Sequence, residues 1–266
     1  MTTIGVLDSG LGGLSVLREI HAQHPQLQTI YYADQAHLPY GTRDPAEVRR
    51  FIGQITRFLL SQGAQAIVIP CHTACAAGLH SLREQHPNIP IVGLEPAVKP
   101  AASVTRSGVV GVLTTAATAR SAMYASLIER FAQGVRVMTA PAGDLVMLVE
   151  AGAPETDASR ALIAAHVEPM LAAGADQIVL ACTHFPFLTP MLHQVIRGRG
   201  AELVDPSAAV ARQVGRVTRA LGGEAASASA GTSHRYFTSG DAAAFAALAS
   251  RWMGVDVVAA QAGLPD

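Results

Sequence analysis

The sequence predicts an α/β protein made of two similar doubly wound lobes. Three observations support this fold class. Short apolar segments typical of buried strands alternate with amphipathic helical segments, the second half of the chain repeats strand-end motifs of the first, and 50% of the 266 residues are hydrophobic while 15% are charged. Strands that alternate with helices favour a parallel sheet with helices on both faces. The apolar content is sufficient for the core of such a fold.

The first half of the chain contains most of the recognisable elements. Apolar or β-branched segments predict strands at 4–7, 29–33 and 66–69. Apolar residues at helical spacing predict helices over 14–20 and 45–61. The residues Pro39–Arg43 predict a loop, because proline and glycine interrupt regular structure there.

Three segments of the first half recur in the second half in the same order. Residues 63–71 and 174–182 are identical at five of nine positions, including the final Cys71 and Cys182, with an offset of 182 − 71 = 111. The segment that begins at Ile4 recurs at Val110 (110 − 4 = 106), and the one that begins at Leu94 recurs at Val204 (204 − 94 = 110). Three matches in register indicate a duplicated α/β unit.

The C-terminal segment has no counterpart in this repeat. Residues 222–231 are rich in Gly, Ala and Ser and predict a flexible connection. Asp241–Met253 predicts a last helix with Phe245, Leu248 and Trp252 on one face. We expect this tail to pack on the first lobe.

Charge and hydropathy exclude several classes of function. The formal net charge is −1, from 19 basic and 20 acidic residues, which gives no electrostatic reason to expect nucleic acid or a membrane surface. No apolar run approaches the length of a membrane span. The N-terminus lacks the basic and apolar segments of a signal peptide. We therefore expect a cytoplasmic protein with no nucleic-acid or membrane partner.

The three cysteines are too few for a disulfide framework. Cys71 and Cys182 each follow a predicted strand, at the sheet edge where α/β proteins bind ligands. If the lobes face each other about a pseudo-two-fold axis, the two thiols lie on opposite sides of one cleft. One thiol would then remove a proton from a carbon and the other would return a proton on the opposite face, which inverts the carbon. Cys75 has no counterpart, and we expect a buried structural thiol there.

A catalytic thiol needs assistance, because a free thiol with a pKa near 8.5 is only about 3% thiolate at neutral pH. Asp8 follows the first strand, His184 follows Cys182 closely, and Glu150 closes the apolar segment Leu145–Val149, which we take as a strand. Backbone N–H groups bind anions where strands turn into helices. The residues at such points, which could hold substrate carboxylates, are Ser9, Gly10, Thr73 and Thr183.

Other chemistries fit the sequence less well. Lys99 is the only lysine, so a pyridoxal-phosphate Schiff base has one candidate and a phosphate-binding P-loop has none. The dinucleotide-binding glycine pattern breaks at Ser15. Thiolates and imidazoles bind zinc, so a Cys/His metal-binding protein is the alternative from a different class, although the spacing matches no usual zinc motif. The residues that would form such a site are Cys71, His72, Cys75, Cys182 and His184. We expect neither a cofactor nor a metal.

Several long segments closely resemble the signature segments of bacterial glutamate racemases, within the aspartate/glutamate racemase superfamily. They occur in the expected order between Ile4 and about Phe245, at residues 8–14, 31–34, 38–43, 92–96 and 180–186. The resemblance implies a first lobe of residues 1–97 plus 207–266, a second lobe of residues 98–206, and an active site between them.

The resemblance also implies a reaction. It is the interconversion of L- and D-glutamate by two thiol bases, without pyridoxal phosphate or metal, for peptidoglycan synthesis. Aspartate or another small acidic amino acid remains the alternative substrate, because pocket shape sets substrate size. The resemblance further implies a homodimer, in an arrangement that the sequence does not determine.

The resemblance assigns roles to individual residues. Cys71 would act on D-glutamate and Cys182 on L-glutamate. The groups that would assist the thiols are Asp8, Glu150 and His184. The residues that would contact substrate are Asp8, Ser9, Tyr40, Gly41, His72, Thr73, Thr183 and His184, with Thr115 and Thr118 as further candidates. His72 departs from the family pattern, in which asparagine usually follows the first cysteine.

Overall fold

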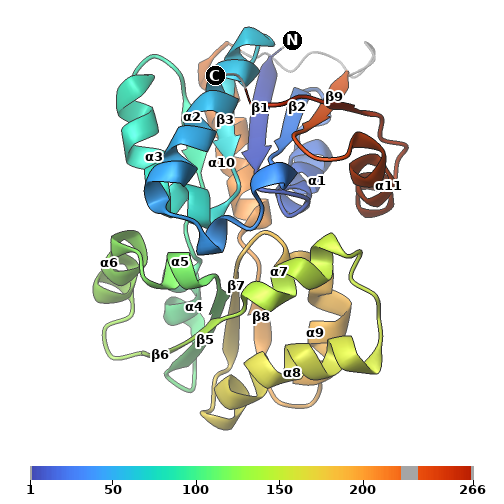
Figure 1. Ribbon diagram of the computed structural model, residues 1–266. Helices are drawn as coiled ribbons and strands as arrows, with labels where there is room; N and C mark the ends of the chain where they lie inside the picture. Colours follow the sequence, from blue (N-terminus) through green and yellow to red (C-terminus); the bar gives the residue numbers. More distant parts are fainter. Residues whose placement is uncertain (1, 223–232, 265–266) are drawn as a thin grey trace. The chain divides into compact units, whose positions relative to one another are not determined.

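A computed structural model describes residues 2–222 and 233–264 (Figure 1). The chain forms two compact units, each built around its own sheet: unit 1 comprises Met1–Leu94 and Ser207–Asp266, and unit 2 comprises Glu95–Pro206. All of the paired strands are parallel, which confirms the predicted α/β class. The connection expected over 222–231 lies, apart from Gly222, outside the described residues.

Unit 1 contains a six-stranded sheet in the order β10-β9-β2-β1-β3-β4. Its strands are β1 (Thr3–Asp8), β2 (Gln28–Ala33), β3 (Ala66–Ile69), β4 (Ile91–Gly93), β9 (His234–Thr238) and β10 (Ala259–Gln261). The tail thus joins this sheet, because β9 pairs with β2 from Thr29 to Ala33. Neither β9 nor β10 was expected from the sequence, although Tyr236–Thr238 is rich in residues that favour strands.

The helices of unit 1 cover both faces of the sheet. They are α1 (Leu14–Gln23), α2 (Pro45–Ser61), α3 (His72–Gln85), α10 (Ser207–Ala220) and α11 (Ala242–Met253), with the 3₁₀ helices η1 (Gln35–His37) and η2 (Tyr40–Thr42). The crossover from β1 to β2 runs opposite to that from β2 to β3, so right-handed connections place α1 and α2 on opposite faces. Helix α1 packs against α10 and α11, whereas α2 packs against α3.

Unit 2 contains a four-stranded sheet in the order β6-β5-β7-β8. Its strands are β5 (Val109–Thr114), β6 (Arg136–Pro141), β7 (Gln177–Ala181) and β8 (Glu202–Val204). Its helices are α4 (Val98–Val104), α5 (Ala116–Ala119), α6 (Ala122–Phe131), α7 (Gly143–Glu150), α8 (Asp157–Ala172), the 3₁₀ helix η3 (Phe185–Leu188) and α9 (Thr189–Ile196). Helix α4 packs against α6, and α8 packs against α9.

The two units share one strand order, as the sequence repeat predicts. The order β2-β1-β3-β4 in unit 1 corresponds to β6-β5-β7-β8 in unit 2. In such a sheet the chain reverses its direction of winding between the first and third strands, and ligands bind beside that point at the carboxyl ends of the strands. The residues after β1 and β3, and after β5 and β7, are therefore the natural ligand-binding positions.

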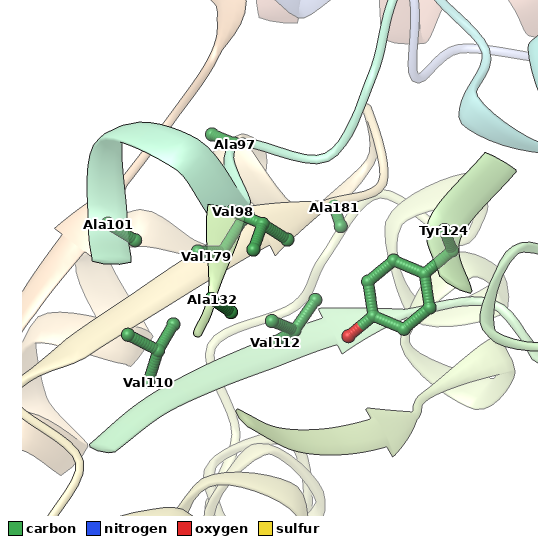
Figure 2. Close-up of a cluster of buried hydrophobic side chains, with 9 residues drawn as sticks. All are labelled: Ala97, Val98, Ala101, Val110, Val112, Tyr124, Ala132, Val179 and Ala181. Atoms are coloured by element: carbon green, nitrogen blue, oxygen red, sulfur yellow. The ribbon is translucent and has the colours of Figure 1, made fainter. Parts of the chain in front are cut away.

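The core of unit 2 shows why these segments form strands. Val110 and Val112 of β5, and Val179 of β7, are fully buried and lie on one face of the sheet, toward Val98 and Ala101 of α4 (Figure 2). Alternate residues of a strand point to one face, so the period of two in the sequence becomes a packed layer. The same cluster includes Ala97, Tyr124, Ala132 and Ala181.

One expected strand is a helix. Leu145–Val149 lies within α7, and Glu150 is the last residue of that helix. A short apolar run does not by itself distinguish a strand from a buried helix. The buried residues Leu145, Val146 and Val149 follow helical spacing, and Asp144 in the first turn favours the helix N-terminus. None of the described helices is long and apolar enough to cross a membrane.

Candidate active site

Strands β1 and β3 bring Asp8 and Cys71 together at the carboxyl edge of unit 1. Asp8 ends β1 and is fully buried, and Cys71 follows β3 after Pro70. The Asp8 carboxylate accepts hydrogen bonds from the Gly10 amide (3.1 Å) and the Ser9 hydroxyl (3.4 Å). The Cys71 Sγ lies 4.0 Å from that Ser9 hydroxyl. Ser9 therefore connects the thiol to the carboxylate.

The turn after Asp8 requires glycine for steric reasons. A Cβ atom on Gly13 would lie 2.7 Å from the Asp8 Cβ and 2.7 Å from the Tyr31 hydroxyl oxygen, closer than a Cβ atom approaches either kind of atom. The Tyr31 hydroxyl donates to the Gly10 carbonyl (2.7 Å), which braces the turn. Gly13 thus allows close packing around Asp8.

Cys71 is also the N-cap residue of the 14-residue helix α3. The partial positive charge of a helix N-terminus favours a thiolate over a thiol. His72 and Thr73 form the start of this helix and are buried. The helix end is therefore a source of assistance to Cys71 that does not depend on a side chain.

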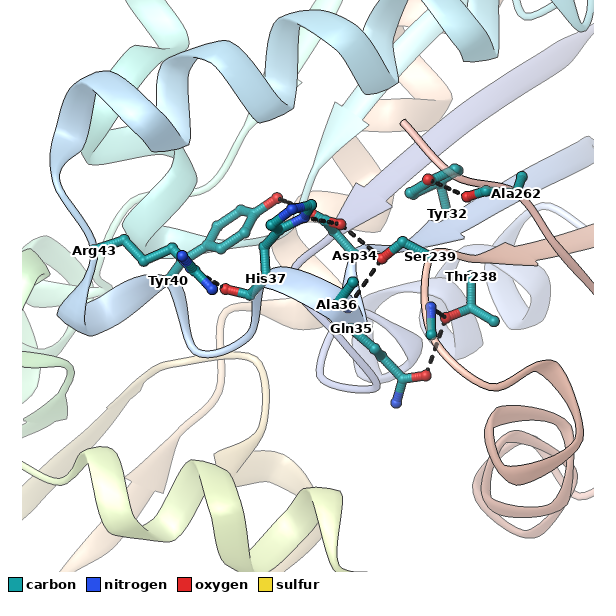
Figure 3. A network of polar contacts seen from close by, with 11 residues as sticks. Tyr32, Asp34, Gln35, Ala36, His37, Tyr40, Arg43, Thr238, Ser239 and Ala262 are labelled. Carbon is teal, nitrogen blue, oxygen red and sulfur yellow. Dashed lines mark hydrogen bonds and ion pairs between the residues drawn. The ribbon is translucent and has the colours of Figure 1, made fainter. Parts of the chain in front are cut away.

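Tyr40 lies on η2, which packs against α3. Its side chain is 1% exposed, and its hydroxyl donates to the Asp34 carboxylate at 2.6 Å (Figure 3). Burial raises the pKa of Tyr40 well above its usual value, and the charges of Asp34, Cys71 and Asp8 raise it further. Tyr40 is thus a neutral hydrogen-bond donor close to the Cys71 site, and Gly41 follows it in η2.

In unit 2, Cys182 is the first member of a Cys–His–Glu chain. Its Sγ lies 3.6 Å from Nδ1 of His184, and Nε2 of His184 lies 2.7 Å from Oε1 of Glu150. The His184 and Glu150 side chains are 2% and 10% exposed. Burial lowers the pKa of His184, but its hydrogen bonds and charge interactions with Cys182 and Glu150 outweigh burial and raise that pKa well above the usual value. A cationic imidazole beside Cys182 favours the thiolate.

Threonines occupy the positions in unit 2 that correspond to Asp8 and Ser9. The repeat offset gives 8 + 106 = 114 and 9 + 106 = 115. The Thr114 hydroxyl donates to the Ala181 carbonyl (3.1 Å), and the Thr115 hydroxyl donates to that of Thr118 (3.0 Å). Unit 2 therefore replaces the strand-end carboxylate of unit 1 with the imidazole and carboxylate of His184 and Glu150.

The candidate residues divide between the units. Unit 1 holds Asp8, Ser9, Tyr40, Gly41, Cys71, His72 and Thr73, and unit 2 holds Thr115, Thr118, Glu150, Cys182, Thr183 and His184. Apart from Glu150, whose helix was expected to be a strand, and Tyr40 and Gly41 on η2, they lie at or just after the carboxyl ends of strands.

Cys75 is buried among backbone hydrogen-bonding groups, as is typical of a structural thiol. Its buried thiol donates to the Ile69 carbonyl (3.2 Å) and accepts from the Leu94 amide (3.3 Å). Lys99 is exposed, and its ammonium lies 5.1 Å from the centre of the Phe131 ring. Within the described ranges, no group of three or more His, Cys, Asp or Glu side chains is arranged to hold a metal ion.

The sequence matches the profile of the Asp/Glu/Hydantoin racemase family over residues 4–214. The chain belongs to this family. Relatives named glutamate racemase include those of Ectopseudomonas mendocina (strain ymp), 50% identical, and Stutzerimonas stutzeri (strain A1501), 48% identical. Each match covers 90% of this chain and 89% of the relative.

Solved structures of racemases share the fold. A glutamate racemase isoform from Bacillus anthracis has a TM-score of 0.87 at 29% identity, with 99% of this chain and 98% of that chain covered. The Escherichia coli glutamate racemase, solved with L-glutamate and the activator UDP-MurNAc-ala, has a TM-score of 0.86 at 32% identity, with 100% and 99% covered. Membership of this racemase family makes the chain an isomerase.

Asp34 is a residue at this site that the sequence reasoning missed. It lies in one of the family-like segments, but no role followed from its position alone. The signal was present, since Asp34 is a polar residue directly after the buried strand β2, and Asp8 is the polar residue that ends β1.

Proposed function

We propose that this racemase interconverts L- and D-glutamate with two thiol bases and no cofactor, and so supplies D-glutamate for peptidoglycan. The observation that carries the proposal is the placement of Cys71 and Cys182 at corresponding strand ends of a duplicated unit, each beside a group that can promote proton transfer. Relatives about 50% identical over 90% of the chain are named for glutamate, which favours glutamate over aspartate.

For L-glutamate the base is Cys182. The imidazolium of His184, held by Glu150, keeps the sulfur as a thiolate that accepts the Cα proton. The electron pair of the broken C–H bond remains on the substrate as a carbanion. Because His184 is itself buried and paired with Glu150, the thiolate does not depend on solvent for its counter-charge.

For D-glutamate the base is Cys71. In the L-to-D direction its thiol donates the proton to the opposite face of the carbanion, so one turnover leaves Cys182 protonated and Cys71 as the thiolate. The N-terminus of α3 favours that thiolate, and the Ser9–Asp8 pair provides a route for its proton. The two thiols thus exchange roles in each turnover, and the reverse reaction restores the starting state.

Substrate binding falls to the polar groups beside each thiol. We assign the substrate carboxylates and amino group to Asp8, Ser9, the Tyr40–Gly41 segment, the His72–Thr73 helix start, and the Thr183–His184 pair. Since the Tyr40 hydroxyl is bonded to Asp34, the contact from Tyr40–Gly41 comes from its peptide groups. These hydroxyl and amide donors would hold the substrate carboxylates without a lysine or arginine side chain.

Exchange in D₂O tests the mechanism. The parent enzyme should racemise L-glutamate with deuterium incorporation at Cα, remain active in strong chelator, and act on aspartate much more slowly. Cys71→Ala and Cys182→Ala should each abolish racemisation, whereas Cys75→Ala should remain active. The Cys71 variant should exchange the Cα proton of L-glutamate only, and the Cys182 variant that of D-glutamate only. Full turnover in either variant would refute the two-base mechanism, and loss of parent activity on chelation would favour a metal site.

We also propose a cytoplasmic location and a homodimer. A reducing compartment keeps both thiols free, as their chemistry requires. Sedimentation of the purified enzyme tests the dimer, and a monomer at all concentrations would contradict it.

A further inference from the structure

Asp34 is a buried carboxylate adjacent to the Cys71 site. It follows β2, it is fully buried, and its amide donates to the Asp8 carbonyl at 2.9 Å. Its Oδ2 accepts from the Tyr40 hydroxyl (2.6 Å), and its Oδ1 accepts from Nδ1 of His37 (2.8 Å) and the Ser239 hydroxyl (2.7 Å) (Figure 3). One carboxylate thus joins three segments of the chain.

The partners of Asp34 are themselves held in place. The His37 ring stacks on Phe51 of α2 with ring centres 4.0 Å apart. The Arg43 guanidinium donates to the His37 carbonyl and lies over the same Phe51 ring. The loop from His37 to Arg43, which carries Tyr40 and Gly41, is therefore fixed at both ends, with Asp34 as its central acceptor.

Ser239 connects this loop to the C-terminal tail. Its amide donates to the Ala33 carbonyl (3.0 Å), and its hydroxyl accepts from the Ala36 amide (3.0 Å) while donating to Asp34. Thr238, the last residue of β9, donates to the Gln35 side chain (3.0 Å). The tail is thus bonded to the segment that leads into the substrate-binding loop.

We propose that Asp34 is a positioning residue for racemisation: it holds the Tyr40–Gly41 segment beside Cys71, and Ser239 of the C-terminal tail supports it. This role rests on the proposed function, since it acts through the Tyr40–Gly41 contact with substrate. The Asp34 carboxylate accepts hydrogen bonds from side chains of η1, η2 and the tail, so its removal would release all three of these contacts.

Loss of the carboxylate should affect substrate binding more than turnover. Without Asp34 the buried Tyr40 hydroxyl has lost its acceptor, so η2 shifts and the substrate contact weakens. The two enantiomers have equal free energies in water, so kcat/KM must fall by one factor in both directions. Loss of a hydrogen bond to a charged group corresponds to about a tenfold to hundredfold change in equilibrium.

The test compares Asp34→Ala with Asp176→Ala. Asp176 is a matched control, because its carboxylate in unit 2 accepts from the Thr105 hydroxyl (2.6 Å) and the Arg106 and Ser107 amides (2.7 and 2.9 Å), before the amino end of β7 and away from Cys182. Asp34→Ala should raise KM for L- and D-glutamate by about tenfold or more with a smaller change in kcat. Asp34→Asn should recover part of the loss, and Ser239→Ala should change KM in the same direction by less. Asp176→Ala should lower Tm while KM stays at the parent value.

A double-mutant cycle identifies the route of the effect. If Asp34 acts through its hydrogen bond with the Tyr40 hydroxyl, Asp34→Ala should raise KM much less in a Tyr40→Phe background than in the parent. Equal KM changes for Asp34→Ala and Asp176→Ala at equal loss of Tm would overturn the proposal, as would additive effects in the cycle. A parent enzyme that does not racemise glutamate would instead refute the proposed function, which is measured independently of the variants.

Discussion

Replacing His184 with Gln should leave the Cys182 thiol without a neighbouring cation and slow racemisation. Gln keeps hydrogen-bonding capacity but carries no charge, so Cys182 would lose the imidazolium now 3.6 Å from its sulfur. Loss of a hydrogen bond to a charged group corresponds to about a tenfold to hundredfold change in equilibrium, and kcat/KM for both enantiomers should fall by about that factor at neutral pH.

The assay is kcat/KM for L- and D-glutamate, followed by circular dichroism from about pH 6 to 9, a range that begins near the ordinary imidazole pKa. The contacts with Cys182 and Glu150 raise the pKa of His184 well above its usual value, so the parent keeps this charge at neutral pH and loses it only as pH rises through the raised pKa. The activity ratio of parent to variant should therefore be largest at neutral pH and should fall as pH rises. Glu150→Gln should move the profile in the same direction by less, because the neutral amide still accepts from His184 but no longer stabilises its charge.

His193→Gln is the matched control, since His193 is exposed on α9 of the same unit. Its profile should equal that of the parent. A His184→Gln profile that is parallel to the parent profile at every pH would refute this prediction, because the loss would then come from geometry and not from the charge of His184.

Two further predictions concern other histidines. Replacing His72 with Asn, the residue usual in the family, should keep glutamate as substrate and change KM, because the imidazole is bulkier than the amide; an unchanged KM would mean that only the backbone there meets the substrate. The His21 ring stacks on His234 (4.0 Å between centres) and lies 3.0 Å from the Thr29 hydroxyl, and burial, followed by the charge of His234, lowers the pKa of His21 from 6.5 to about 4. Because the pKa of His21 is lower in the folded protein than in the unfolded chain, protonation favours the unfolded chain. The folded protein therefore keeps its full stability above pH 6.5 and loses part of it as pH falls toward 4. Between pH 7 and 5 the free energy of unfolding should fall by up to about 2 kcal/mol on account of His21. Urea unfolding of the parent and of His21→Gln measures this, and equal losses in both proteins would contradict it.

The fold class and both thiols followed from local patterns in the sequence. Helix α2 begins and ends at the predicted residues, Pro45 and Ser61, because Asp44 caps its first turn and apolar residues recur at helical spacing through it. Strand β3 likewise has its predicted bounds. Cys71 and Cys182 could be placed at strand ends because the repeat sets them directly after matching buried strands. Such patterns need only residues a few positions apart.

Partners distant in the chain required the tertiary structure. Glu150 reaches His184 across 34 residues, from a helix that an apolar run of five residues did not distinguish from a strand. Asp34 bonds to Ser239 across 205 residues, through a strand that enters the first sheet beside β2. Hydrophobic periodicity shows which face of an element is buried, but it contains no information on which elements become neighbours. The sequence therefore placed both thiols at strand ends and named candidates to assist them, because those signals are local. Only the folded chain showed the hydrogen bonds of Glu150 with His184 and of Asp34 with Tyr40 and Ser239, because these join distant parts of the sequence.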